Sequence, residues 1–388
     1  MKKRLKGAAV AVCALIICIL TVCGYAAGDV ARVRKLPAEL TATSFRAVDI
    51  GAAKGYLRNG KLIFKLFGIF PVKTIEIRES GEEVYIGGTP IGLSMEVMGV
   101  IVEDIGTVST GAGEVAARTT LKKGDIITSA GGAEVKCVDD LAAVVDALDG
   151  AEDITMNVLR SGKETQAQAT PVHEALSGRL RLGLWLKDRV NGIGTLSFVR
   201  KDYRFGSLGH AITSGETVVP VRGGEAKNCK LIGYTRGKRG APGEIKGLIR
   251  GEKIGTVDAN NVYGVFGSMT VPYFGKSYPV GSRLDVTSGK AEIYTTIGDT
   301  TDFYDIEIIR AMPQNKRSDK SMVLRVTDRR LLDTTGGIIQ GMSGSPIIQN
   351  GRIVGAVTHV FVNDLTKGYG IYLDWMYLYD VRRHKIVV

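Results

Sequence analysis

Short apolar runs separated by glycine-rich turns dominate the second half of the chain. From residue 173 onward, β-prone runs recur at turn-sized spacing. These runs are Gly194–Val199, Val218–Val221, Cys229–Tyr234, Val262–Val265, Ala291–Ile297, Asp305–Ile309 and Met322–Val326. No long amphipathic helix pattern interrupts them, so residues 173–388 are predicted to form an all-β domain.

The preceding region, residues 81–172, mixes strand and helix patterns. Val97–Val102 and Ile154–Leu159 are apolar runs of strand length. Between them, Cys137–Leu148 repeats apolar residues at three- and four-residue spacing, which predicts an amphipathic helix. We therefore expect an α+β module here.

The N-terminal part has a membrane-segment pattern. Met1–Lys6 is basic, and Ala8–Ala27 has no charged residue. Since about 20 apolar residues span a bilayer as a helix, this segment is predicted to be a membrane anchor, with its basic end in the cytoplasm and the rest of the chain outside. A cleaved signal peptide is the alternative, because Gly24–Ala26 has the small-x-small form of a cleavage site. In residues 29–80, a linker is expected to precede two or three strands within Leu62–Ile77 that join a neighbouring domain.

Composition and charge narrow the function classes. The formal net charge is +11, with dense basic patches at Arg236–Arg239 and Arg382–Lys385. Basic and aromatic residues do not interleave as in nucleic-acid-binding surfaces, so a nucleic-acid partner is not predicted. The excess charge indicates a solvated surface that favours an anionic membrane face. Outside the apolar segment only Cys137 and Cys229 occur, and no His/Cys cluster has zinc spacing, so neither a metal nor a cofactor is expected.

A glycine-rich turn with the sequence GMSGSP lies at Gly341–Pro346, between two apolar runs. The pattern predicts a strand, a tight turn and a second strand. A serine in such a turn can present its hydroxyl outward, and the surrounding N–H groups can face a substrate carbonyl, as an oxyanion hole requires. Taken alone, an ordinary β-turn of small residues is the simpler interpretation.

The turn resembles the nucleophile loop of chymotrypsin-like serine peptidases, whose pattern is Gly-x-Ser-Gly-x-Pro. Here Met342 stands where that loop usually has an acidic residue. The longer segment Thr335–Ile371 is similar to the stage IV sporulation protein B peptidases of endospore-forming bacteria. This resemblance implies two six-stranded barrels with the active site in the cleft between them. It also implies Ser343 as the nucleophile, in preference to Ser345, and the backbone N–H groups of Gly341 and Ser343 as the oxyanion hole.

The family pattern also implies a base and an acid. His210, within FGSLGHAI, matches the family's histidine motif and would accept the Ser343 proton. Asp328 matches the carboxylate that orients the imidazole. Asp202 is the rival acid, and Asp328 could instead be a turn aspartate paired with a neighbouring arginine. His359 could line the cleft or serve in packing.

Residues 81–172 resemble a PDZ domain. Ile91, Gly92 and Leu93 belong to PIGL, which resembles the loop that binds a carboxylate through backbone N–H groups. Leu121–Ile127 resembles the segment that leads into the next strand of PDZ domains. The resemblance implies peptide binding by β-augmentation at this loop. A PDZ-like fold used only as a brace or a membrane-protein contact is the alternative.

The expected architecture is mainly β in four parts. These are an N-terminal transmembrane helix (1–28), a juxtamembrane β/linker segment (29–80), an α+β PDZ domain (81–172) and a chymotrypsin-like double β-barrel peptidase domain (173–388).

The resemblance implies a membrane-associated serine endopeptidase of sporulation signalling. It would act in the space between the forespore and mother-cell membranes, on an extracytoplasmic region of a membrane-bound regulatory complex. This cleavage would activate intramembrane processing of a sigma-factor precursor, and the enzyme would also cleave itself. The implied partners are the protein substrate, a peptide at the PDZ domain and the membrane. A non-catalytic PDZ scaffold with a degenerate peptidase domain is the alternative, and the complete set of motif residues favours the enzyme.

Overall fold

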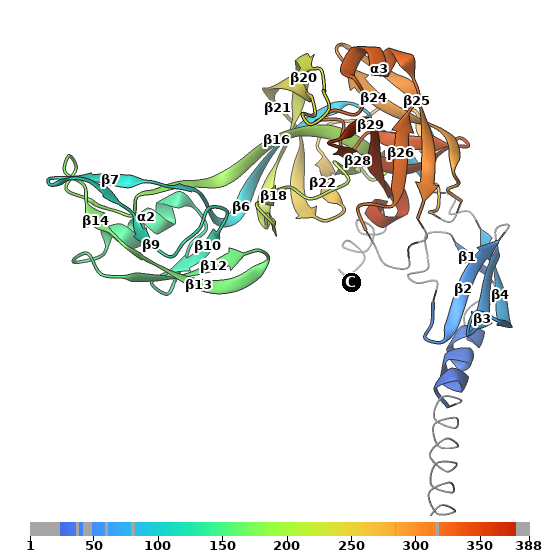
Figure 1. The fold of residues 1–388 in the computed structure, drawn as a ribbon, viewed down its shortest axis with the longest axis horizontal. Helices are drawn as coiled ribbons and strands as arrows, with labels where there is room; N and C mark the ends of the chain where they lie inside the picture. Colours follow the sequence, from blue (N-terminus) through green and yellow to red (C-terminus); the bar gives the residue numbers. More distant parts are fainter. Residues whose placement is uncertain are drawn as a thin grey trace, which may run out of the picture.

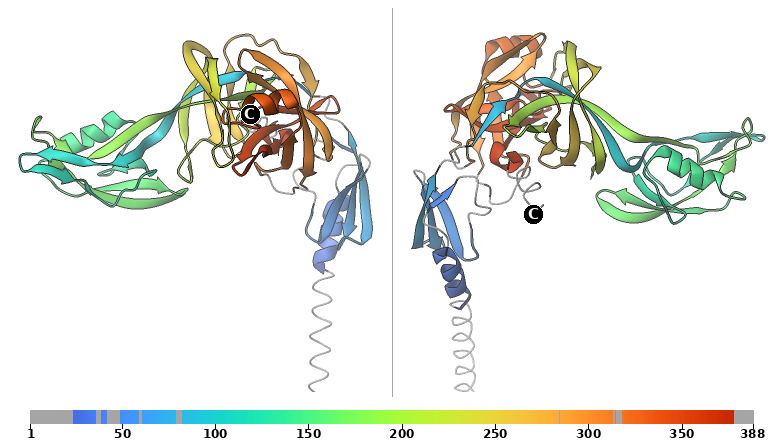
Figure 2. Two further views of the ribbon diagram at one scale, coloured as in Figure 1. Left: turned by 45° about the horizontal axis from the view of Figure 1, so that its top comes forward. Right: turned by 180° about the vertical axis from the view of Figure 1, so that it is seen from behind.

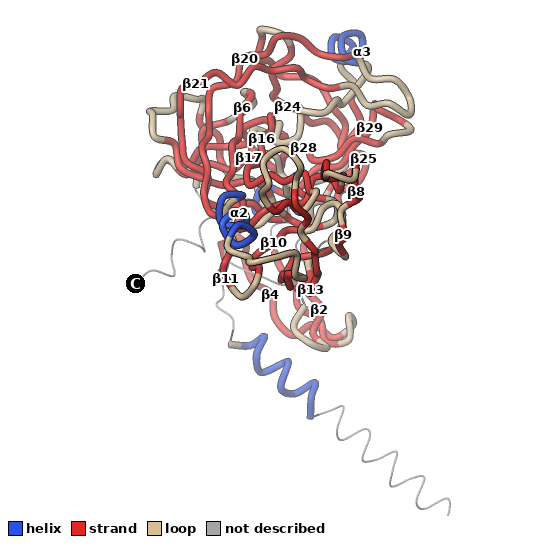
Figure 3. The backbone as a smooth tube through the Cα atoms, turned by 90° about the vertical axis from the view of Figure 1, so that its left-hand side faces the viewer, coloured by secondary structure: helices blue, strands red, loops and turns tan. Residues whose placement is uncertain are grey.

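The computed structural model describes residues 24–35, 39–41, 49–58, 61–78, 82–283, 285–312, 314 and 318–377. Within these ranges the chain is mainly β-structure (Figure 3, strands in red), and the labelled helices are α2 (Val138–Asp146) and α3 (Arg329–Thr335). Further helical segments cover residues 24–34 and 373–377. A small N-terminal sheet and a lobe containing α2 lie at opposite ends of the molecule, with two barrels between them (Figures 1 and 2).

The N-terminal sheet has the strand order β1-β4-β3-β2. Its strands are β1 (Glu39–Thr41), β2 (Ala53–Arg58), β3 (Lys61–Leu66) and β4 (Phe70–Arg78). Leu62 and Phe64 alternate along β3 and are buried together with Val33 of the preceding helix. The strands predicted within Leu62–Ile77 are therefore present. They form a separate small unit, however, because all their strand pairings lie within this sheet.

The predicted membrane segment Ala8–Ala27 lies outside the described residues except for residues 24–27. Among the helices of the described ranges, none has both the length and the apolar composition needed to cross a bilayer.

The first barrel is a closed ring within a 13-stranded sheet, in the pairing order β16-β17-β22-β21-β20-β6, with β6 pairing back to β16. Its strands are β6 (Pro90–Ile105), β16 (Leu184–Arg200), β17 (Arg204–Ser207), β20 (Val221–Thr235), β21 (Glu244–Asn261) and β22 (Gly264–Met269). The strands β5 (Glu83–Ile86) and β23 (Ser277–Pro279) extend this sheet, and β18 (Thr213–Ser214) pairs with β19 (Thr217–Val218). Alternate side chains from β6 and β17, such as Leu93, Met95 and Phe205, fill the barrel core.

The second barrel is closed in the order β24-β25-β26-β29-β28-β27. Its strands are β24 (Gly289–Ile297), β25 (Thr300–Ala311), β26 (Met322–Val326), β27 (Pro346–Gln349), β28 (Arg352–Phe361) and β29 (Asp364–Tyr372). Its core contains Ile293, Ile308, Leu324 and Ile347. The two rings of six strands agree with the predicted pair of barrels.

The lobe at the other end packs α2 against a sheet. Its strands are β7 (Thr107–Thr110), β8 (Gly113–Ala116), β9 (Arg118–Thr119), β10 (Ile126–Ala130), β11 (Ala133–Glu134), β12 (Ile154–Arg160), β13 (Lys163–Thr170), β14 (Val172–His173) and β15 (Leu180–Arg181). Leu141 and Val145 of α2 are buried against Ile127 and Met156. The amphipathic helix and the α+β character predicted here are confirmed.

The long strands β6 and β16 join the lobe to the first barrel, so the expected boundary at residue 172 does not separate two sheets. The prediction of a peptide-binding loop at Ile91, Gly92 and Leu93 is wrong. These residues lie within β6, where Ile91 pairs with Gly194 of β16 on one side and Asn228 of β20 on the other. Both strand edges are occupied and the apolar side chains fill the barrel core, so this backbone is not open to a peptide carboxylate.

Candidate active site

The nucleophile turn depends on two glycines in left-handed backbone conformations. Gly341 has φ +97° and Gly344 has φ +100°. A Cβ added at Gly344 would lie 2.0 Å from the carbonyl oxygen of Thr195 in the first barrel. The turn of the second barrel is therefore in direct contact with β16 of the first, and Ser343 lies at this junction.

The two serines of the turn have different environments. Ser343 is half-buried, and its hydroxyl donates to the carbonyl oxygen of Thr358 at 2.7 Å. Ser345 is fully buried, and its Oγ lies 2.7 Å from the carbonyl oxygen of Met342 and 2.8 Å from Thr295 Oγ1. Because Ser345 is enclosed and bonded, only Ser343 of this pair can reach a substrate.

Two backbone donors of the turn are unused. The N–H groups of Met342, Gly344 and Ser345 donate to the carbonyls of Ile339, Val357 and Met342, respectively. The N–H groups of Gly341 and Ser343 have no acceptor in the part of the chain that the structure describes. These are the two donors predicted for the oxyanion hole, and they are available to a substrate carbonyl oxygen.

Thr195 orients the carbonyls that belong to the same two residues. Its N–H donates to Ser343 O at 3.0 Å, and its Oγ1 donates to Gly341 O at 2.8 Å. Thr195 is buried in β16, so this contact fixes the turn to the first barrel.

His210 follows β17 in a turn where Leu208 and Gly209 both have positive φ. Its Nδ1 lies 2.9 Å from the carbonyl oxygen of Ala211. A carbonyl can only accept, so Nδ1 carries the proton and Nε2 keeps the lone pair that a general base needs. A Cβ at Gly209 would lie 2.9 Å from Thr358 Cγ2, so this turn packs against the residue whose carbonyl binds Ser343. The structure thus brings His210 and Ser343 to a shared neighbour, without a hydrogen bond between them.

His359, on β28, stacks on His210 with ring centroids 4.9 Å apart and an interplanar angle of 37°. Its Nδ1 is buried and has no hydrogen-bond partner among the described residues. Burial lowers the pKa of His210, and burial together with the neighbouring charge of His210 lowers the pKa of His359. The carboxylate of Asp319 opposes both shifts. The negative charge of Asp319 thus raises the pKa of both histidines, and no motif in the sequence marks this residue.

Asp328 has a different environment from the one a triad acid requires. Its carboxylate caps α3 by accepting the Arg330 N–H at 2.8 Å, and it also accepts Arg330 Nη2 at 2.8 Å and the Asp305 N–H at 3.3 Å. The hydrogen bonds from the Arg330 side chain are the main cause of the lowered pKa of Asp328. The structure therefore gives Asp328 the arginine-paired arrangement and no hydrogen bond to His210. Its catalytic role stays a prediction.

The rival acid, Asp202, is also engaged elsewhere. It accepts Arg200 Nη2 at 2.7 Å and the Arg204 N–H at 3.3 Å. In the described ranges no group of three or more His, Cys, Asp or Glu side chains is placed to hold a metal ion.

A pocket of about 340 Å³ adjoins the turn between the two barrels. It is lined by Asn191, Gly192, Ile193, Glu244, Ile245, Ile249, Gln340 and Gly341. Strand β21 meets the turn here, because the Ile245 N–H donates to Gln340 O at 2.8 Å. The mixed apolar and polar lining beside the Gly341 N–H suits the side chain of a bound peptide.

A serine on a glycine turn, two unused N–H groups and a histidine from the adjoining barrel together define a peptidase. Residues 178–377, just over half of the chain, match the SpoIVB peptidase S55 family. The chain belongs to this family.

Among solved structures, the chain is similar to the Rv3671c protease in its inactive form. The identity is 14% and the TM-score 0.30, over 50% of this chain and 85% of that one. For the active form of the Rv3671c protease from M. tuberculosis the identity is 14% and the TM-score 0.29, over 47% and 70% of the two chains. No curated protein matches the chain.

Proposed function

We propose that the chain is a serine endopeptidase with Ser343 as nucleophile and His210 as general base. The observation that carries this proposal is the pairing of a half-buried Ser343 with the unused N–H groups of Gly341 and Ser343. In the proposed reaction, Ser343 Oγ attacks the scissile carbonyl while its proton passes to His210 Nε2. The oxyanion is bound by the two N–H groups, and the His210 proton then goes to the leaving amine.

The proposed reaction requires one rearrangement. Ser343 Oγ would leave the Thr358 carbonyl by rotation about its Cα–Cβ bond and would then donate to His210 Nε2. Catalytic hydrogen bonds often become short only in the substrate complex, so this arrangement is compatible with an enzyme awaiting its substrate.

We also propose the signalling role that the resemblance implies. The enzyme would be anchored or secreted through its N-terminal segment and would act outside the cytoplasm, between the forespore and mother-cell membranes. It would cleave a membrane-bound regulatory complex, and so activate intramembrane processing of a sigma-factor precursor. It would also cleave itself. Membership of the SpoIVB peptidase family supports this proposal.

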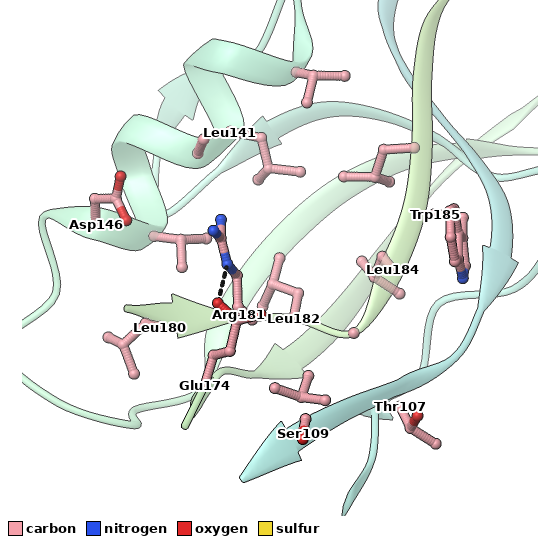
Figure 4. A pocket seen from close by; sticks show the side chains of 16 residues that line it. Thr107, Ser109, Leu141, Asp146, Glu174, Leu180, Arg181, Leu182, Leu184 and Trp185 are labelled. Carbon is pink, nitrogen blue, oxygen red and sulfur yellow. Dashed lines mark hydrogen bonds and ion pairs between the residues drawn. The ribbon is translucent and has the colours of Figure 1, made fainter. Parts of the chain in front are cut away.

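For peptide binding by the PDZ-like lobe, we propose a groove beside α2 in place of Ile91–Leu93. A pocket of about 470 Å³ lies there, and Leu141 of α2 lines it together with Leu182 and Leu184 of the chain entering β16 (Figure 4). Among the described residues, residues 184–187 of β16 pair only with β6, which leaves their other edge for an added strand. An apolar, extended peptide fits such a site.

The decisive experiment treats the purified full-length chain, in mild detergent, with a fluorophosphonate-rhodamine probe. Ser343→Ala and Ser345→Ala are run beside it, and casein hydrolysis and self-cleavage products are followed by mass spectrometry. We expect labelling at Ser343 that Ser343→Ala abolishes and that Ser345→Ala retains at a reduced rate. Absence of labelling and hydrolysis in all three chains would favour the scaffold alternative.

A further inference from the structure

We propose that Ser345 and Thr295 are positioning residues that hold the Ser343 N–H toward the substrate oxyanion. This inference rests on the proposed peptidase function of Ser343. It assigns a task to Ser345, which is the serine of the turn that cannot reach a substrate.

The Ser343 N–H belongs to the peptide bond between Met342 and Ser343. Its carbonyl oxygen accepts two hydrogen bonds, from the Ser345 N–H at 2.9 Å and from Ser345 Oγ at 2.7 Å. A trans peptide is planar, and its C=O and N–H point in opposite directions. Fixing the Met342 carbonyl toward the buried Ser345 therefore directs the Ser343 N–H to the opposite side, where it has no acceptor among the described residues.

A second hydroxyl fixes the first. The Ser345 hydroxyl has one hydrogen, and the Met342 carbonyl can only accept it. Ser345 Oγ also donates to Thr295 Oγ1 at 2.8 Å, so its single hydrogen is shared between the Met342 carbonyl and the Thr295 hydroxyl, and both contacts hold its rotamer. Thr295 and Ser345 are both fully buried, which restricts their rotamers. The chain of bonds runs from Thr295 on β24, through Ser345, to the Met342 carbonyl.

The other donor of the oxyanion hole is oriented differently. The carbonyl of the Gln340–Gly341 peptide accepts the backbone N–H of Ile245, from β21 of the first barrel. That bond involves no side chain, so a hydroxyl substitution at Thr295 leaves it in place. Of the two oxyanion donors, the Ser343 N–H is thus the one whose orienting bonds include side-chain hydroxyls of the second barrel.

The test uses Thr295→Val, which keeps the side-chain shape and removes the hydroxyl, with Thr295→Ser as the variant that keeps the hydroxyl. Ser345→Ala is the second variant, and it removes the other hydroxyl of the proposed pair. Phosphonylation of Ser343 by fluorophosphonate-rhodamine is measured over a range of probe concentrations in the full-length chain. Removing one oxyanion donor typically costs 10²- to 10³-fold in rate, so loosening one should lower the maximal rate constant about 10-fold or more. The half-saturating probe concentration should stay unchanged, and Thr295→Ser should restore the rate.

Thermal unfolding of each variant identifies any loss of fold, and the shape-conserving Thr295→Val keeps the test valid if Ser345→Ala unfolds. Folded variants that react at the wild-type maximal rate, beside a reactive wild type, overturn the positioning role alone. A wild type that never reacts at Ser343 overturns the proposed function and this inference with it. A parallel loss of affinity for a peptide trifluoromethyl ketone, whose adduct carries the oxyanion, is the supporting result.

Discussion

The nucleophile turn and the histidine turn differ in how far each is arranged for catalysis. In the nucleophile turn, Ile245 and Ser345 bind the carbonyls of the two peptide groups that carry the predicted oxyanion donors, and Thr195 holds the turn to the first barrel. In the histidine turn, His210 donates to the adjacent Ala211 carbonyl, while Ser343 donates to Thr358. The two oxyanion donors are thus already oriented by hydrogen bonds, whereas the proposed proton transfer from Ser343 to His210 needs Ser343 Oγ to leave the Thr358 carbonyl.

This difference has a physical reason. Peptide groups in a hydrogen-bonded turn are oriented by several bonds at once, so their direction survives without a substrate. A serine rotamer is held by one hydrogen bond with a modest net free energy, and a bound substrate can exchange it. We therefore expect substitutions in the histidine turn and in the nucleophile turn to have different effects on hydrolysis and on stability.

The largest effect is expected from His210→Ala. Without the imidazole, Ser343 has no base, and the rate of casein hydrolysis should fall about 10⁴-fold or more. The nucleophile turn with its two N–H donors should keep its structure. We therefore expect the thermal unfolding temperature to change little. His173→Ala is the control, because His173 is an exposed histidine in β14. Equal losses in the two variants would contradict the assignment of His210.

Gly344→Ala should act on the fold of the nucleophile turn. The added Cβ would meet Thr195 O at 2.0 Å, and φ is +100°. We expect the free energy of unfolding to fall by about 3 kcal/mol or more, measured by urea denaturation. Gly351→Ala is the matched control, since Gly351 also has positive φ (+73°) but open space around it. It should cost only about 1 kcal/mol.

The sequence predicted the barrels and the turns that carry Ser343 and His210 because their signals are local. Period-2 apolar runs mark strands, and glycines beside Ser343 and His210 mark the turns that present them. The short resemblance to a PDZ loop failed for Ile91–Leu93. A four-residue match does not show whether the backbone lies in an open loop or, as here, in a strand that is paired on both edges.

The order of residues along the chain was also not enough to predict the environment of the expected triad acid, Asp328. Asp328 matches the family pattern and lies between His210 and Ser343 in the chain, but Arg330 is two residues away and binds its carboxylate in a helix cap. The contact between His359 and His210 joins two strands distant in sequence, so no local pattern predicts it.

Asp328→Asn distinguishes a triad acid from a helix cap. Replacing a triad aspartate with asparagine costs about 10⁴-fold in kcat. In the arrangement described here, asparagine keeps the cap of α3, so we expect hydrolysis to stay within about 10-fold of the parent. Asp328→Ala should lower the free energy of unfolding by about 1 kcal/mol, because the cap is lost. A 10⁴-fold loss in a folded Asp328→Asn variant would support the predicted catalytic role of Asp328.

The smallest effect is a pH dependence that sharpens the comparison at the histidine turn. Burial lowers the pKa of His210 and His359 below the ordinary value of 6.5, so the unfolded chain takes up protons first as the pH falls. The stability from the two neutral rings is fully present above pH 6.5 and is lost as the pH falls from that value through the lowered pKa of each folded-state ring. Each buried histidine contributes a slope of at most about 1.4 kcal/mol per pH unit, and the partly exposed His359 contributes less.

Urea denaturation between pH 5 and pH 8 should show a shallower slope in His359→Gln than in the parent, with His173→Gln as the control for losing a surface histidine. The acid limb of Ser343 labelling should persist in His359→Gln, because His210 remains the base. An unchanged stability slope would mean that the stacked His359 is not held neutral by the fold.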